Sequence, residues 1–175
     1  NFNADYLRQV DALRTAPIVF TVIDSDKPLA DAPGALLMTG TKRIVIGMPL
    51  SKHCPELAPP GQHLLPVWGV PPDSLHHIDI KEEARLNLED IRQLFPDFDK
   101  HGRILRMEVR DIDHEFPATR SWMGYDMPQE TPLPNLYHVG DAVKPFGWQG
   151  LAACALGARL VVNEVRKRFK PGERG

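Results

Sequence analysis

Long apolar runs are missing from this sequence of 175 residues. The longest lie at 151–156 and 160–162, far short of the roughly 20 residues that a membrane-spanning helix needs. No N-terminal signal peptide is visible. The sequence has two cysteines, Cys54 and Cys154, which are too few for a disulfide framework and fit a reducing compartment. We therefore expect a cytoplasmic protein without a transmembrane segment.

An excess of charge is missing as well, since 21 Lys and Arg residues stand against 23 Asp and Glu residues. A net charge of −2 gives no broad attraction for nucleic acid, so nucleic acid is excluded from the expected partners. The histidines lack the spacing of a metal site, because His76 and His77 are adjacent and His53-Cys54 has no C-x-x-C beside it. A G-x-S-x-G elbow is absent too. We expect neither a metal centre nor a hydrolase.

The patterns that are present predict an α+β or mixed α/β fold, with a sheet and flanking helices. Strand patterns occur at 18–24, 35–39, 41–48, 62–70, 103–112 and 135–139. Helical periodicity occurs at 4–14, 81–95 and 149–168. The prolines of 49–61 predict an irregular segment. Pro66 predicts that its strand lies at a sheet edge or carries a bulge.

The sequence pattern changes near 130–134, where two prolines separate two regions of the chain. We expect a sheet-containing region over 1–130, a strand–turn–helix over 131–168 and a short tail over 169–175. The tail and the end of the last helix are basic, which suits a helix C-terminus in solvent and leaves peripheral membrane contact as an alternative.

The most informative segment runs from 131 to 165. A short apolar strand ends in Gly140-Asp141, and after a loop Gln149-Gly150 opens a helix of small residues. The first turn of a helix offers unpaired N–H groups and positive dipole character, and Gly150 lets a ligand approach the backbone. This arrangement predicts a site for an anion or a polar ligand. A turn cap with packed alanines is the structural alternative.

This segment resembles the C-terminal flavin-closing motif of the FAD-dependent phytoene desaturase and carotenoid isomerase group, a branch of the amine-oxidase-like flavoproteins. The matching residues are Pro134, Leu136, Tyr137, His138, Val139, Gly140, Asp141, Gln149, Gly150, Ala153, Ala155 and Gly157. The resemblance implies that Asp141 binds a hydroxyl of the flavin ribityl chain. It also implies that the backbone of Gln149, Gly150 and Leu151 meets the pyrimidine edge of the flavin ring. The region before the motif resembles the substrate domain of that group.

One departure from the group is large. Its members begin with a G-x-G-x-x-G turn that binds the diphosphate of FAD, and this sequence has no Gly-x-Gly. Because the chain also begins with Asn1 rather than Met, we expect a C-terminal fragment of a longer flavoprotein that does not retain FAD by itself. The resemblance implies hydride transfer to the flavin from an apolar or amine substrate. The alternative function is a non-catalytic binding or interaction module that keeps the strands and helices of such a domain without its cofactor.

Four aromatic residues in irregular segments near the motif are candidates for an apolar substrate wall: Trp122, Tyr125, Phe146 and Trp148. Ordinary core packing is the alternative for them. No residue stands out as a catalytic acid or base. The last helix carries apolar residues that we expect to pack on the rest of the protein or on a second copy, so a homo-oligomer is an expected partner state.

Overall fold

The computed structural model describes residues 2–13, 15–73, 75–112, 126–145, 147–148 and 150–169. The chain divides into two compact units. The sheet unit comprises Ala16–His114, and the terminal unit combines Asn1–Thr15 with Glu115–Gly175. The sequence-based division at 130 concerns functional regions and stays a prediction.

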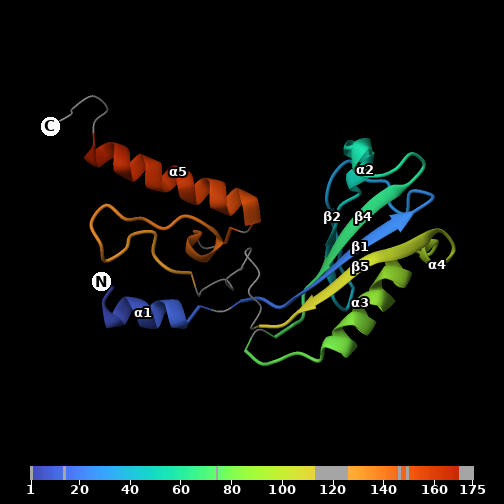
Figure 1. Ribbon diagram of the computed structural model, residues 1–175, viewed down its shortest axis with the longest axis horizontal. Helices are drawn as coiled ribbons and strands as arrows, with labels where there is room; N and C mark the ends of the chain where they lie inside the picture. The colour runs from blue at the N-terminus through green and yellow to red at the C-terminus, as the bar shows by residue number, and fades with distance from the viewer. Residues whose placement is uncertain are drawn as a thin grey trace. The chain divides into compact units, whose positions relative to one another are not determined.

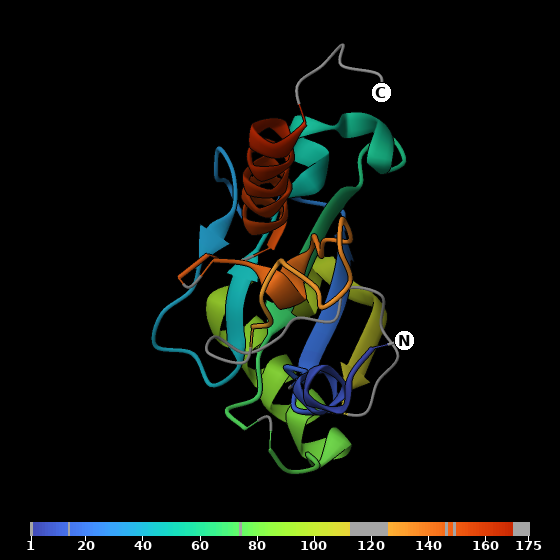
Figure 2. The same ribbon diagram turned by 90° about the vertical axis from the view of Figure 1, so that its left-hand side faces the viewer.

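The sheet unit is built on a five-stranded antiparallel sheet in the order β2-β3-β4-β1-β5 (Figure 1). Its strands are β1 (Ile18–Ser25), β2 (Leu36–Leu37), β3 (Ile44–Gly47), β4 (His63–Gly69) and β5 (Gly102–Arg110). Three helices complete it: α2 (Leu50–His53), α3 (Ile80–Leu94) and α4 (Phe98–His101). Figure 2 shows the same unit after a quarter turn, with α3 packed along the sheet. The predicted mixed α/β class is confirmed.

Alternation along β1 decides which face of the sheet becomes the core. Val19, Thr21 and Ile23 are fully buried, while Phe20 and Val22 between them are half-buried. This is the period-two pattern of a strand with one face in the core and one face more open. The core itself joins strands and helices through Ile23, Ile44, Leu65, Val67, Ile91, Phe95 and Phe98.

Helix α3 begins where Asp79 caps it, since the Asp79 carboxylate accepts hydrogen bonds from the backbone N–H groups of Lys81 and Glu82. The helix ends at Leu94, two residues before Pro96. The predicted helix at 81–95 is therefore confirmed. Its buried side differs from the expected apolar stripe, because Glu83, Asn87 and Asp90 are buried beside Ile91.

The carboxylate of Asp90 explains one of these polar residues. Asp90 is fully buried and accepts hydrogen bonds from three consecutive backbone N–H groups, those of Lys42, Arg43 and Ile44. These groups lie where the chain enters β3, so α3 fixes the start of that strand. A second buried contact joins the same two elements, because Arg43 Nη2 donates to Glu83 Oε1 at 2.9 Å.

Two expectations about proline are wrong. The segment 49–61 contains α2 and a 3-10 turn at Pro55–Leu57, because Pro55 occupies the first turn, where no N–H donor is needed. Strand β4 lies between β3 and β1 rather than at an edge, so the edge half of that expectation is wrong; the other half, a bulge, has a counterpart in the register shift between Ile44 and Ile46 where β3 pairs with β4. Pro66 is tolerated there because its carbonyl accepts from Met48, one residue beyond β3. The missing N–H thus faces the point where pairing with β3 ends.

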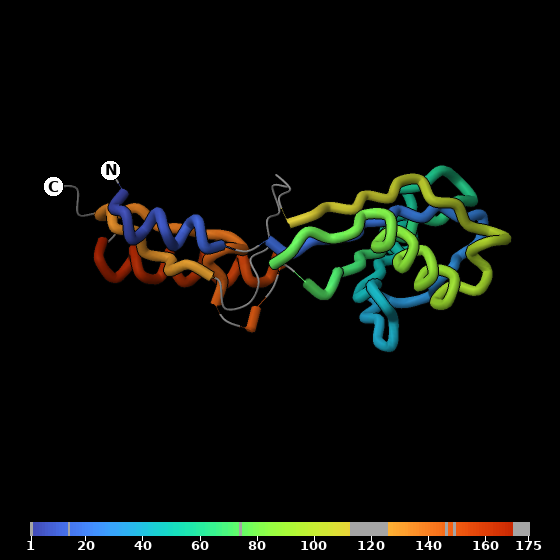
Figure 3. The backbone as a smooth tube through the Cα atoms, turned by 90° about the horizontal axis from the view of Figure 1, so that it is seen from below, coloured from blue at the N-terminus to red at the C-terminus, as the bar shows by residue number. Residues whose placement is uncertain are grey.

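The terminal unit contains α1 (Ala4–Asp11), a 3-10 turn η2 (Asp141–Val143) and α5 (Gly150–Arg168). Within this unit the segment 126–145 runs between α1 and α5 (Figures 1 and 3). Helices were predicted at 4–14 and 149–168, and both exist. The strand expected at 135–139 is wrong: in the described part of this segment the pairing is one isolated bridge, Glu130 to Tyr137. Asn135 takes a left-handed φ of 63°, which a continuous strand does not accommodate.

Candidate functional site

The predicted ligand-binding turn begins at Gly140, which has a φ of 139°. This backbone conformation favours glycine, and a side chain built at Gly140 would meet no atom within 4 Å. The 3-10 turn η2 follows at once and starts with Asp141. The turn therefore places a carboxylate, whose side chain is 14% exposed, beside an open stretch of backbone.

Asp141 caps helix α5. Its Oδ1 atom accepts a hydrogen bond from the backbone N–H of Gly150 at 3.1 Å. Gly150 has a φ of 61°, again in the region that favours glycine. The next residue, Leu151, is 90% exposed. The structure thus brings together Asp141, Gly150 and Leu151, three residues that the sequence had selected, at a helix start that is open to solvent.

A buried lysine, Lys144, stabilises the turn that carries Asp141. Lys144 is 5% exposed, and its Nζ atom donates to Asp126 Oδ1 at 2.6 Å and to the carbonyl of Asp141 at 2.7 Å. The same ammonium lies 3.8 Å from Asp141 Oδ2. A parallel backbone bond, from Met127 N–H to the Ala142 carbonyl, joins the same two segments at 2.8 Å. The sequence analysis missed Lys144 because a lone lysine in a loop normally lies in water.

Helix α1 supports the segment that leads into this turn. Tyr6 is buried together with Met127 and Val143, and its hydroxyl hydrogen-bonds to His138 Nε2. The Tyr6 and His138 rings are nearly parallel, with centroids 5.8 Å apart. His138 comes two residues before Gly140, so α1 fixes the strand-like approach to the turn.

The far end of α5 is tied to the same segment. Arg168 donates to the Tyr137 hydroxyl at 2.9 Å and to Glu130 Oε1 at 2.7 Å. Near the middle of the helix, the Gln129 side chain donates to the Gly157 carbonyl at 2.9 Å. A side chain at position 157 would lie 3.1 Å from that amide nitrogen. The small residues of α5 therefore allow the close approach that the sequence predicted, here to the protein's own chain.

Of the other predicted site residues, the structure describes one and leaves four undescribed. Trp148 is 48% exposed, and its N–H donates to the Pro145 carbonyl. Gln149, Trp122, Tyr125 and Phe146 lie outside the described residues. Their predicted roles, in cofactor contact for Gln149 and in a substrate wall for the aromatic residues, stay predictions.

The sheet unit contains an apolar surface that the sequence analysis did not select. On the face of the sheet turned away from the buried Val19, Thr21 and Ile23, the rings of Phe20 and Trp68 pack with their centroids 5.1 Å apart. The two residues are paired across β1 and β4. We call the half-buried side chains Ile18, Phe20, Val22 and Trp68, together with the buried Pro66, the open face. The alternation within 18–24 and 62–70 was the signal that could have revealed it.

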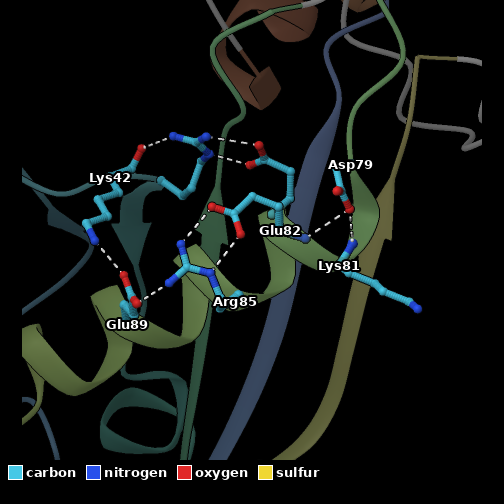
Figure 4. Close-up of polar contacts among 8 residues, drawn as sticks. Lys42, Asp79, Lys81, Glu82, Arg85 and Glu89 are labelled. Atoms are coloured by element: carbon cyan, nitrogen blue, oxygen red, sulfur yellow. Dashed lines mark hydrogen bonds and ion pairs between the residues drawn. The ribbon is translucent and has the colours of Figure 1, made fainter.

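A network of exposed charges runs along α3 (Figure 4). Arg85 pairs with Glu82 and Glu89, and Lys42 also reaches Glu89. The hydrogen bond from Arg85 lowers the pKa of Glu82, and the bond from Lys42 lowers the pKa of Glu89. Paired ions in water are typical of a solvated helix surface rather than of a reactive site. Among the described residues, no group of three His, Cys, Asp or Glu side chains could hold a metal ion.

The comparisons with known proteins point to one family. The family model of flavin containing amine oxidoreductases matches residues 6–166. The crystal structure of an oxidoreductase from Methanosarcina mazei matches with a TM-score of 0.77 and 32% identity, over 91% of this chain and 37% of that one. A structure from Pyrococcus furiosus matches with a TM-score of 0.66 and 21% identity, over 94% of this chain and 36% of that one. At that identity the second likeness shows the fold alone.

No curated protein matches the chain. The chain spans little more than a third of the length of either matching structure. No helix in the described ranges is long and apolar enough to cross a membrane.

Proposed function

Because the chain belongs to the flavin containing amine oxidoreductases, we propose that it is the C-terminal part of an FAD-dependent oxidoreductase resembling the phytoene desaturases and carotenoid isomerases. It would contribute the ribityl and ring contacts of the flavin site and part of the substrate wall. The observation that carries this proposal is the contact between Asp141 and Gly150, which joins a carboxylate to a solvent-open helix start.

The residues of the turn fit a flavin in chemistry and in space. A ribityl chain offers hydroxyl donors, and the Asp141 side chain, 3.8 Å from the Lys144 ammonium, offers oxygen acceptors. Side chains built at Gly140 or Gly147 would meet nothing within 4 Å, so the backbone there is accessible. The first turn of α5 adds positive dipole character beside the polar edge of a ring.

The flavin, when bound, supplies the acceptor for a hydride, and the protein supplies position and electrostatics. Asp141 would accept hydrogen bonds from the ribityl hydroxyls. The N-terminus of α5 would stabilise negative charge near the pyrimidine edge. The open face, where the rings of Phe20 and Trp68 pack at an interplanar angle of 41°, is an apolar surface suited to a hydrocarbon substrate or to the apolar part of an amine.

The test is to replace Asp141 by Ala in the longer flavoprotein to which we assign this chain. Loss of a charge-assisted hydrogen bond of roughly 1.5–3 kcal/mol should weaken flavin binding about 10- to 100-fold. The matched control is Asp5→Ala, because the Asp5 side chain is 75% exposed and pairs with Arg8 on the surface of α1. Flavin content and affinity that do not change in Asp141→Ala would remove Asp141 from the site.

A second experiment separates the enzyme fragment from a binding module. We expect the 175-residue chain to bind FAD no better than millimolar, because it lacks the glycine-rich turn for the diphosphate. Titration of the chain with FAD, followed by flavin fluorescence, measures this. Micromolar binding would show that the chain contains a phosphate site of its own. A gene without an upstream G-x-G-x-x-G sequence would favour the binding module.

A further inference from the structure

The sheet unit contains a pocket of about 350 Å³ that the flavin proposal does not use. It lies where β1 ends and β4 begins, between the loop after β1 and helix α2. Its apolar lining comes from Pro28, Leu29, Ala30, Pro49, Leu64 and Leu65. This volume is at the lower end of the range for small-molecule sites, which are also mostly apolar.

The polar groups of this pocket include two hydroxyls, one of which, Ser25 Oγ, donates to the His63 carbonyl at 3.5 Å. Ser25 is 2% exposed and Ser51 is 9% exposed, so both hydroxyls lie in the wall rather than in water. Ser51 Oγ already accepts the backbone N–H of Leu64 at 2.8 Å, which leaves its proton to be donated. Asp31, Lys52 and His63 complete the polar lining.

An ion pair between Lys52 and Asp31 connects the two sides of the pocket. The hydrogen bond from Lys52 lowers the pKa of Asp31, which favours its ionised form. The Asp31 side chain is 84% exposed, whereas that of Lys52 is 42% exposed. An ion pair so accessible to water contributes little stability. Another carboxylate can therefore replace Asp31 as the partner of Lys52 at little cost.

We infer that this pocket binds a free single-chain carboxylate, with its hydrocarbon tail against Leu29 and Leu64 and its head at Lys52. The hydrogen-bond donors Ser51 and Lys52 and the apolar lining of the pocket match an amphiphile whose polar end only accepts hydrogen bonds. A cationic head group would be repelled by the Lys52 ammonium. The lining offers it one opposite charge, that of Asp31, whose side chain is 84% exposed. The inference is independent of the flavin proposal, because every lining residue belongs to the sheet unit and none to the Asp141 turn.

Isothermal titration calorimetry of the chain with octanoate, 1-octanol and octylammonium at pH 7 tests the inference. We expect octanoate to bind about three- to tenfold more tightly than octanol, and octylammonium to bind most weakly. Lys52→Met should remove the preference for octanoate while octanol still binds. Lys27→Met is the matched control, since Lys27 is exposed on the same loop outside the lining and should keep the preference.

Location is tested with Ala30→Trp, whose indole should fill the pocket and abolish binding of both octanoate and octanol. Should that variant fail to fold, the methyl resonances of Leu29, Leu64 and Leu65 in the unaltered protein give the same answer, because octanoate must shift them. Absence of octanoate binding would overturn the inference. So would an unchanged preference in Lys52→Met, or methyl shifts confined to other residues.

Discussion

Replacing Lys144 by Met should loosen the turn that carries Asp141 while leaving the sheet unit intact. The substitution keeps much of the side-chain volume and removes the ammonium group. That group makes two short charge-assisted contacts, to Asp126 Oδ1 at 2.6 Å and to the Asp141 carbonyl at 2.7 Å. Since the three side chains are at most 14% exposed, water replaces these contacts poorly.

The size of the effect follows from the contacts. A hydrogen bond to a charged group contributes roughly 1.5 kcal/mol or more, so two of them suggest a loss of about 3 kcal/mol. A loss of that size raises the population of the open turn about a hundredfold. Amide hydrogen exchange measures it directly, because the N–H groups of Met127 and Gly150 bond to Ala142 and Asp141 and are exposed when the turn opens.

Two comparisons make this result specific. Lys167→Met removes an exposed ammonium that pairs with Glu164 on α5, so it should change exchange by less than about threefold. The amides of β1, which pair with β4 and β5, report on the sheet unit and should keep their protection in Lys144→Met. Unchanged exchange at Met127 and Gly150 would refute the role of Lys144. Equal losses in both units would show a global effect instead.

Three further outcomes are expected. Asp90→Ala should destabilise the sheet unit by about 3 kcal/mol in urea unfolding, since three backbone N–H groups, that of the buried Ile44 among them, lose a fully buried acceptor; a loss below about 1 kcal/mol would contradict this. In the longer flavoprotein, Gly150→Val should abolish flavin binding, because the φ of 61° at this position favours glycine, whereas Lys167→Ala should leave flavin binding unchanged. If both variants retained flavin equally, the start of α5 would not be part of the flavin site. The lowered pKa of Glu89 implies stability that is complete above its ordinary value of 4.5 and is lost as the pH falls through the lower folded value. Urea midpoints at decreasing pH should show this loss, and Lys42→Met should reduce it.

Periodicity was sufficient to predict the strands and helices that bury apolar side chains. The alternation in 18–24 and the helical spacing in 81–95 each predicted an element that exists. The Gly-Asp pair before a helix of small residues predicted a polar site at the start of that helix. The hydrogen bond from the Gly150 N–H to Asp141 was not predicted, and a carboxylate next to open helix N–H groups is stabilised locally.

Features that depend on distant partners could not be read from the sequence. Asp90 is buried because it meets backbone groups nearly fifty residues away, and hydropathy assigns an aspartate to the surface. Lys144 is buried for a similar reason, through Asp126 on another segment. Pro66 indicated that its strand would not be an interior one. The strand is interior, and Pro66 is tolerated because β3 ends beside it. Hydrophobic patterns cannot show any of these partners.

The pairing of Ile18 with Arg110 puts the two ends of the sheet unit on neighbouring strands. The chain therefore leaves the terminal unit and returns to it through adjacent positions, so the sheet unit has the topology of an inserted domain. The two halves of the terminal unit are separated by about a hundred residues of sequence, and closing a loop of that length has an entropic cost. Folding of the sheet unit first would remove most of that cost. From this topology we expect the insertion to fold before the turn that carries Asp141.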